Sequence, residues 1–356
     1  MQGKLTLSDG TVFLGESFGA EGNTSGEVVF NTGMVGYPES LTDPSYYGQI
    51  LVLTYPLVGS YGVPPKEFWE SKKIQVKAVI VQNYIDQPSH FESEKSLGQW
   101  LSDERIPALQ GIDTRQLTRK LREHGVMLGK IVISHQSSAS RQYDPNSENV
   151  LSNVSVDKVE VYGKGPSTSL RVKKKNIILI DCGAKENIIR SLVKRGVKVT
   201  RVPWDFNPLK ADFDFDGVFI SNGPGDPKQA KETIKNVAAV LKKGIPTLGI
   251  CLGSQILALA AGGNTFKLKF GHRGQNQPVI DKSTGKAIIT SQNHGFAVDM
   301  KSLGSDWDEW FVNLNDGTNE GIRHKKKPFL AVQFHPEASP GPTDGGFLFD
   351  EFLESI

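Results

Sequence analysis

One cysteine stands at a junction where its side chain could act as a nucleophile. Cys251 follows a short apolar run, 246–250, that predicts a buried strand, and it precedes a Leu- and Ala-rich run, 254–261, that predicts a buried helix. A glycine lies two residues away on each side, which gives the pattern G-x-C-x-G. This is the thiol counterpart of the nucleophile elbow, in which small residues allow a strained turn. The pattern favours a nucleophile over the alternative, a small buried apolar residue.

The predicted place of Cys251 also offers a way to activate its thiol. A side chain at a helix N-terminus faces the positive end of the helix dipole, which lowers the pKa of a thiol and increases the nucleophilic thiolate. The backbone N–H of Leu252, the next residue, could stabilise an oxyanion. We therefore expect a nucleophilic thiolate with an oxyanion site beside it.

Cysteine chemistry of this kind needs an imidazole that takes and returns a proton, and a third group that fixes the imidazole tautomer. Two histidines follow predicted strands, His294 after 287–291 and His335 at the end of 328–334. His335 has a carboxylate two residues away, that of Glu337, whereas His294 has only amide neighbours. Each histidine taken alone is more often structural or exposed. Spacing favours His335 only weakly, so both remain candidates.

A glycine-containing loop follows another predicted strand, 217–220. The loop 221–227 contains Gly223 and Gly225, whose backbone N–H groups suit an anion or oxyanion site, although such a loop is more often only a turn. In parallel α/β sheets, ligands bind beyond the carboxyl ends of the strands. We therefore expect this loop and Cys251 to be neighbours.

The second half of the chain must position these residues, and its pattern predicts a parallel sheet covered on both faces. Strand and helix patterns alternate from residue 176 onward, which is typical of α/β folds. The predicted strands are 177–180, 197–202, 217–220 and 246–250, and the predicted helices between them are 186–195 and 234–241.

The first half is predicted to be rich in strands. Asp9 and Gly10 separate two alternating runs, which predicts a hairpin with a type I′ turn. Asp113 is a candidate cap for a helix over 113–123 that Gly125 would end. The other predicted strands are 26–32, 50–54 and 74–81, a further helix is predicted at 94–101, and a turn-rich stretch lies at 33–45.

Length and composition indicate two or three globular domains. The chain has 356 residues, 38% hydrophobic residues, 22% charged residues and a net charge of +2, which shows no bias toward nucleic acid. A stretch rich in Ser, Asn, Asp, Lys and Gly predicts a linker at 151–174 between domains at 1–150 and 175–356.

Two cysteines are too few for a disulfide framework or a zinc site of their own, so we expect a reducing compartment and no metal. No run reaches the roughly 18 apolar residues of a membrane helix, and a cytoplasmic location is expected.

Three motifs in this order resemble the class I, triad-type glutamine amidotransferases. They are GPGDP at 223–227, GICLG at 249–253, and His335 with Glu337. The first domain, through GEVVFNT at 26–32 and TDPSY at 42–46, resembles the glutamine-hydrolysing small subunits or domains of carbamoyl phosphate synthetases. The resemblance covers nearly the whole chain. It implies a β-rich α/β N-terminal domain followed by an amidotransferase domain with a mostly parallel sheet covered by helices.

The resemblance also implies a reaction. L-Glutamine would be hydrolysed to glutamate and ammonia, and a synthetase partner would use the ammonia, bicarbonate and ATP to make carbamoyl phosphate for pyrimidine or arginine synthesis. Cys251 would form a glutamyl thioester, His335 would shuttle the proton, and Glu337 would orient the ring. Gly223 and Leu252 would form the oxyanion hole. The implied glutamine-binding residues are Ser45, Gly223, Gly225, Leu252, Gln255, Asn293, Gly295 and Phe296.

One residue departs from the family pattern. Ser254 stands where the family commonly has histidine, and we expect activity to survive because that histidine is not a triad member. The chain contains no G-x-x-x-x-G-K-[ST] motif, so we expect ATP and its metal on a large partner and no cofactor here. The partner could be a separate subunit or a fused domain, and we expect the first domain to form much of its interface.

Other functions stay open at this point. The chain could be the amidotransferase component of another synthase, such as one of anthranilate or guanylate synthesis, although the first domain argues against it. It could be a non-catalytic scaffold that regulates a synthetase, although all three triad residues are present. A cysteine hydrolase of esters or peptides would need a different order of partners and would leave the first domain unexplained.

Overall fold

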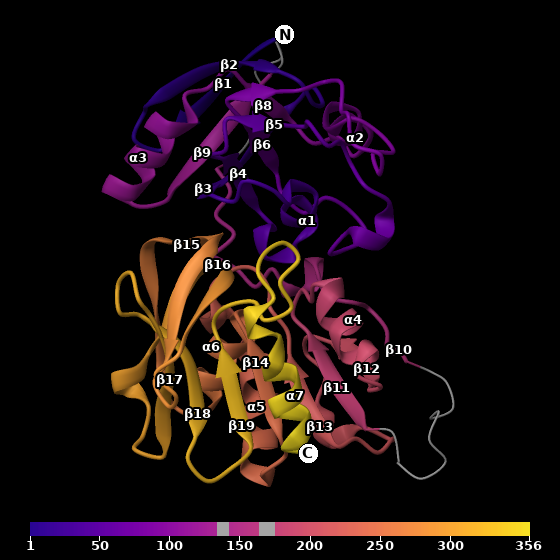
Figure 1. Cartoon of the computed structure of the whole chain (residues 1–356). Helices are drawn as coiled ribbons and strands as arrows, with labels where there is room; N and C mark the ends of the chain where they lie inside the picture. Colours follow the sequence, from indigo (N-terminus) through magenta and orange to yellow (C-terminus); the bar gives the residue numbers. More distant parts are fainter. Residues whose placement is uncertain (134–141, 164–174) are drawn as a thin grey trace. The chain divides into compact units, whose positions relative to one another are not determined.

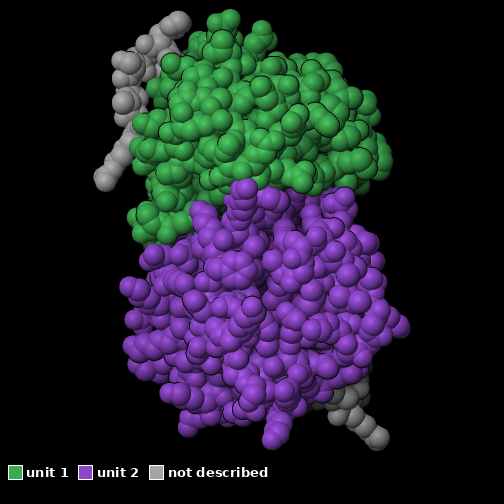
Figure 2. All heavy atoms as spheres, turned by 90° about the vertical axis from the view of Figure 1, so that its left-hand side faces the viewer, with its two compact units in different colours: residues 1–148 green, residues 149–356 purple. Residues whose placement is uncertain are grey.

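The computed structural model describes residues 1–133, 142–163 and 175–356. They form two compact units, Met1–Glu148 and Asn149–Ile356, which Figure 2 colours separately. The division lies two residues before the predicted end of the first domain. Part of the predicted linker 151–174 belongs to the second unit, and its residues 164–174 lie outside the described residues.

Seven strands among the described residues of the first unit close into a barrel (Figure 1). In chain order they are β1 (Gln2–Leu7), β2 (Val12–Ser17), β3 (Asn23–Asn31), β4 (Gln49–Leu53), β6 (Ala78–Ile80), β8 (Ala108–Gln110) and β9 (Met127–Val132). Their order around the barrel is β1-β2-β8-β6-β4-β3-β9, and antiparallel pairing of β1 with β9 closes it. Strands β8, β6, β4 and β3 are parallel neighbours.

Smaller elements complete the first unit. They are the helices α1 (Tyr37–Thr42), α2 (Leu97–Asp103) and α3 (Thr114–His124) and the short parallel pair β5 (Leu57–Val58) and β7 (Asn83–Tyr84). The predicted cap of α3 is confirmed, because the Asp113 side chain accepts a hydrogen bond from the Gln116 N–H at 2.8 Å. Trp69 and Trp100, both buried, pack with ring centroids 4.6 Å apart in the core of this unit.

Three expectations for the first unit were wrong in detail. The β1–β2 hairpin is present, but φ is positive only at Gly10 and not at Asp9, as a type I′ turn would require. The turn-rich stretch 33–45 contains α1, which Pro38 starts by supplying a fixed φ in the first turn. The helix predicted at 94–101 begins at Leu97 because Ser96 is its N-cap, accepting from the Gln99 N–H at 3.2 Å.

In the second unit, ten described strands form one sheet (Figure 1). In sheet order they are β10 (Glu160–Tyr162), β12 (Lys198–Pro203), β11 (Asn176–Asp181), β13 (Gly217–Ile220), β14 (Thr247–Ile250), β19 (Phe329–Val332), β18 (Asn319–His324), β17 (Trp307–Asn313), β15 (Asn264–Asp281) and β16 (Ala287–Asp299). Five neighbouring strands, β12, β11, β13, β14 and β19, are parallel, which confirms the predicted α/β class. The strands from β18 to β16 extend the sheet in antiparallel pairs.

Helices cover both faces of the parallel strands. They are α4 (Glu186–Lys194), α5 (Lys231–Lys243), α6 (Leu252–Ala260) and α7 (Phe347–Glu354). Alternate residues of a strand point to opposite faces. In β11, Ile177 and Leu179 therefore share a core with α4 and α7, whereas Ile178 and Ile180 share a core with α5 and α6. None of the described helices combines the length and the apolar character needed to span a membrane.

Candidate active site

The cysteine lies in a strained turn between β14 and α6. Cys251 occupies the N-cap position of α6 with φ 53° and ψ −107°, a backbone conformation that L-residues rarely adopt. The two flanking glycines are required by close approach of the backbone. A Cβ atom at Gly249 would lie 2.4 Å from the Gly253 carbonyl oxygen, and one at Gly253 would lie 2.2 Å from the Ile220 carbonyl oxygen. The G-x-C-x-G pattern thus forms a nucleophile elbow.

Sheet pairing brings His335 to the same edge as the cysteine. Strands β14 and β19 are parallel neighbours, with Ile250 paired to Val332, and the Cys251 N–H donates to the Val332 carbonyl at 2.9 Å. The chain leaves both strands at their carboxyl ends, and His335 follows β19 after two residues. Cys251 and His335 are both buried, at 2% and 3% exposure.

His335 is oriented by a carboxylate. Its Nδ1 lies 2.6 Å from Glu337 Oε1, so Nδ1 carries the proton that the carboxylate accepts. Its Nε2 has no hydrogen-bond partner among the described residues and is the nitrogen left to exchange a proton. Burial alone would lower the pKa of His335, but the Glu337 carboxylate and the nearby Cys251 thiol raise it to about 10. The ring therefore favours its protonated form, and Nε2 is the nitrogen that could take the proton of the thiol.

A buried lysine, which the sequence reasoning missed, supports the carboxylate. Lys185 Nζ lies 3.1 Å from Glu337 Oε1 and also donates to the Ala338 carbonyl. Burial raises the pKa of Glu337, but the positive charges of Lys185 and His335 outweigh it and lower the pKa to about 2. Lys185 follows β11, and the rule that sites lie beyond the carboxyl ends of parallel strands could have found it.

The loop after β13 presses against the start of α6. A Cβ atom at Gly223 would lie 2.0 Å from the Cys182 carbonyl oxygen and 2.8 Å from a methyl carbon of Leu252, so only glycine fits there. Gly225 has φ 85°, the left-handed region that favours glycine. The structure thus brings Gly223 next to Leu252, the residue that follows Cys251.

Several predicted glutamine-binding residues lie beside the cysteine. The Asn293 carbonyl oxygen is 3.7 Å from Cys251 Sγ. Gln255 Nε2 donates to the Phe296 carbonyl at 2.9 Å and to the Gln333 side chain at 3.0 Å, so its amide is engaged in holding the strand that carries Asn293 and Phe296. Gly295 lies between these residues, and a Cβ atom there would be 3.2 Å from the Arg273 guanidinium.

Ser45 and Ser254 complete the predicted residues. Ser45 lies in the first unit, where its backbone N–H donates to Asp43 Oδ1 at 2.9 Å, and its role stays a prediction. Ser254 is fully buried in α6, and its Oγ has no hydrogen-bond partner among the described residues. It stands one turn beyond the cysteine and outside the triad.

His294, the other candidate base, has different partners. Its Nδ1 lies 2.8 Å from the Phe296 carbonyl oxygen and its Nε2 3.3 Å from Gln292 Oε1. Burial, with added repulsion from His272, holds its pKa well below the usual value. Among the described residues, His272, His294 and Glu320 form the one group of side chains with metal-binding spacing. The geometry favours His335 as the base that serves Cys251.

Two family models match the chain. They are "Glutamine amidotransferase class-I" over residues 178–355 and "Carbamoyl-phosphate synthase small chain, CPSase domain" over residues 5–131. The multifunctional protein CAD of Squalus acanthias is 52% identical over 361 residues, which cover 98% of this chain and 16% of that protein. The carbamoyl phosphate synthase arginine-specific small chain of Neurospora crassa is 48% identical over 365 residues, which cover 99% of this chain and 79% of that one. The chain thus spans about one sixth of the multifunctional relative and about four fifths of the small chain.

Proposed function

The chain belongs to the carbamoyl-phosphate synthase small-chain family, and on this premise we propose that it hydrolyses L-glutamine to glutamate and ammonia for carbamoyl phosphate synthesis. The observation that carries the proposal is the elbow cysteine beside a histidine whose other nitrogen lies 2.6 Å from a buried carboxylate. The match of residues 5–131 to the small-chain model speaks against a component of another synthase.

In the proposed first step, Cys251 gives its proton to His335 Nε2 and attacks the side-chain amide carbon of glutamine. The negative charge moves to the amide oxygen, where the backbone N–H groups of Gly223 and Leu252 would stabilise it. The imidazolium then gives its proton to the amide nitrogen. The carbon–nitrogen bond breaks, ammonia leaves, and a glutamyl thioester remains.

In the second step, neutral His335 takes a proton from water, and the hydroxide attacks the thioester. The carbon–sulfur bond breaks, glutamate forms, and the Cys251 thiolate and the His335 imidazolium are restored. Glu337 keeps the ring in the tautomer that leaves Nε2 free, and Lys185 keeps Glu337 ionised in its buried site. Gly225, Gln255, Asn293, Gly295 and Phe296 are the proposed contacts of the α-amino and α-carboxylate groups of glutamine, and the contact with Ser45 stays a prediction from the family resemblance.

A synthetase partner would consume the ammonia. We propose that a large ATP-using subunit or fused domain binds this chain and carries ATP and its metal, since this sequence has no phosphate-binding loop motif. Its relatives include both an arginine-specific small chain and multifunctional proteins, which supports either arrangement. Met34 and Val35, exposed apolar residues of the first unit, support a partner surface there. The two free buried cysteines are compatible with the cytoplasmic location that we propose.

The test measures ammonia and glutamate release from L-glutamine by the parent chain and by Cys251→Ala, with and without a carbamoyl phosphate synthetase large component. Release that rises with the partner and disappears in the variant is expected. Release that persists in Cys251→Ala would remove this cysteine from the mechanism. No release under any condition would favour a non-catalytic scaffold.

A further inference from the structure

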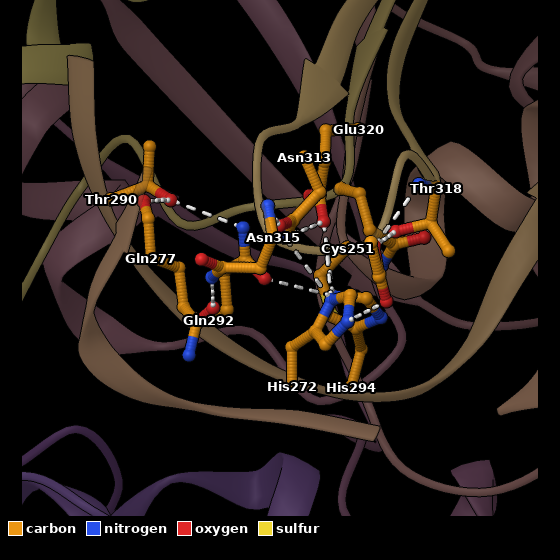
Figure 3. A network of polar contacts seen from close by, with 12 residues as sticks. Cys251, His272, Gln277, Thr290, Gln292, His294, Asn313, Asn315, Thr318 and Glu320 are labelled. Atoms are coloured by element: carbon orange, nitrogen blue, oxygen red, sulfur yellow. Dashed lines mark hydrogen bonds and ion pairs between the residues drawn. The ribbon is translucent and has the colours of Figure 1, made fainter. Parts of the chain in front are cut away.

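Three strands of the antiparallel half bring a second group of titratable side chains together, none of which belongs to the triad. His272 on β15 and His294 on β16 are paired in register, with perpendicular rings whose centroids lie 4.9 Å apart. Glu320 on β18 joins them, and the ligand atoms of all three residues lie within 4.8 Å of one another. Figure 3 shows the three side chains side by side, and all are buried. The triad mechanism does not use His272 or Glu320.

Outer hydrogen bonds fix the tautomers of both rings. His294 Nδ1 lies 2.8 Å from the Phe296 carbonyl oxygen, which can only accept, so Nδ1 carries a proton. His272 Nε2 lies 2.8 Å from a carboxylate oxygen of Asp316, so this nitrogen also carries a proton. In neutral rings the lone pairs are therefore on His294 Nε2 and His272 Nδ1.

Both lone pairs face the same carboxylate. His272 Nδ1 is 3.2 Å and His294 Nε2 is 3.8 Å from Glu320 Oε1. A nitrogen lone pair and a carboxylate oxygen repel each other unless a cation lies between them, and one proton can serve only one of the two nitrogens. Glu320 Oε2 is buried and has no hydrogen-bond partner among the described residues. The Asn313 amide nitrogen lies 3.0 Å from Glu320 Oε1, to which it donates, and 3.4 Å from His272 Nδ1. It leaves Glu320 Oε2 and the His294 Nε2 lone pair without a donor in the described part of the chain, and a cation could satisfy both.

We propose that His272, His294 and Glu320 bind a divalent transition metal ion, with Zn²⁺ as the best match. Two imidazoles and a carboxylate are a common zinc donor set, and donor atoms in a tetrahedral zinc site lie roughly 3.3 Å apart. The two ring nitrogens lie 3.2 and 3.8 Å from Glu320 Oε1, and all three ligand atoms lie within 4.8 Å of one another. Gln292 Oε1, 3.3 Å from His294 Nε2, or a water is the fourth ligand. The outer bonds to Asp316 and to the Phe296 carbonyl are those that hold metal-binding histidines elsewhere.

A proton on His272 is the competing occupant. Burial lowers the pKa of His272, but Glu320 and Asp316 outweigh burial and raise it. A proton placed there bonds Glu320 and leaves the His294 Nε2 lone pair facing two oxygen atoms, those of Glu320 and Gln292. A metal ion satisfies both nitrogens at once, which is why we favour it.

The metal would fix a segment that borders the cysteine. His294 lies between Asn293, whose carbonyl is 3.7 Å from Cys251 Sγ, and Phe296, whose carbonyl accepts from Gln255. Metal binding at His294 would therefore immobilise residues 293–296. This consequence for glutamine binding rests on the proposed function, whereas the metal site itself does not.

The experiment uses the full chain carrying Cys251→Ala, because a thiol next to an imidazole would itself bind zinc. Metal-free protein is titrated with Zn²⁺ by calorimetry, and with Co²⁺ while its visible absorption is followed. We expect one equivalent of each ion to bind and a tetrahedral Co²⁺ spectrum without thiolate charge-transfer bands. Zinc should also raise the Tm in a concentration-dependent manner.

Two variants in the same background locate the metal. Glu320→Gln should weaken zinc binding by more than the roughly 10- to 100-fold typical of outer-shell changes, and Asp316→Asn should weaken it within that range. His124→Asn, which removes an exposed histidine of α3 in the first unit, is the matched control and should bind zinc normally.

Folding of each variant is checked by circular dichroism, and Asp316→Asn keeps the test decisive if Glu320→Gln does not fold. Absence of zinc and cobalt binding by folded Cys251→Ala protein would overturn the proposal and leave a proton as the occupant. If Glu320→Gln and Asp316→Asn both bind zinc as tightly as the Cys251→Ala protein, the ion lies elsewhere and the proposal is equally overturned. Because the Cys251→Ala protein lacks the nucleophile, these results do not depend on whether the chain hydrolyses glutamine.

Discussion

The ammonium group of Lys185 lies 3.1 Å from Oε1 of Glu337, and both side chains are almost completely buried. The same carboxylate oxygen lies 2.6 Å from His335 Nδ1, so Glu337 is held between two positive groups. This arrangement keeps a buried carboxylate ionised and hydrogen-bonded to the imidazole of His335, the proposed base for Cys251.

Lys185→Met should destabilise the fold because it leaves the Glu337 charge buried with one positive neighbour fewer. Removing one partner of a buried pair costs about 3–5 kcal/mol of unfolding free energy. Urea unfolding measures the change. The double variant Lys185→Met with Glu337→Gln removes both charges and should recover part of the loss; a double variant as unstable as the single one would argue against the ion pair as the cause.

Glutamine hydrolysis should depend on His335 far more steeply than on His294. His335→Asn removes the group that exchanges the proton and should lower kcat by about 10²- to 10⁴-fold. His294→Asn removes a ring that holds residues 293–296 and should act mainly on KM. Steady-state glutaminase kinetics of the two matched variants measure this. Equal losses of kcat would mean that the geometry around His335 is not the catalytic one.

The triad pair should make stability depend on pH in two windows. The pKa of His335 is raised from 6.5 to about 10, so its contribution is fully present below 6.5 and is lost as the pH rises toward 10. The pKa of Glu337 is lowered from 4.5 to about 2, so its contribution is present above 4.5 and is lost as the pH falls toward 2. Unfolding free energy measured across this range should therefore fall on both sides of about pH 5–6 from these two groups. Glu337→Gln should flatten both slopes, and unchanged slopes would contradict the assignment.

Gly223→Ala should damage catalysis through the backbone. The added methyl would meet the Cys182 carbonyl oxygen at 2.0 Å, so the loop must move and carry its N–H group away from the proposed oxyanion position. Loss of one oxyanion donor lowers kcat by about 10²- to 10³-fold. Gly304→Ala, at a position with nothing within 4 Å of the added Cβ, is the control and should leave kcat unchanged. Normal kcat in a folded Gly223→Ala protein would exclude this loop from the oxyanion hole.

Local patterns in the sequence predicted local structure well. The elbow at Cys251 and the cap at Asp113 each involve residues within a few positions of one another, so spacing and residue type are enough to specify them. The carboxylate at Glu337 was found for the same reason, because it lies two residues from His335. Where the details were wrong, as at the Asp9 turn and at α1, several backbone conformations suit the same short sequence.

The sequence by itself therefore determined the α/β class of the second unit, the elbow, and the order of the motifs that resemble an amidotransferase. Only the tertiary structure decided which partners meet: β1 closes the barrel on β9, β19 lies beside β14, Lys185 reaches Glu337, and His272 and His294 converge on Glu320. These partners lie far apart in the chain or on different strands. Periodicity and caps depend on neighbouring residues, whereas strand order and register depend on the packing of a whole sheet and its cores, and no short stretch of sequence contains that information.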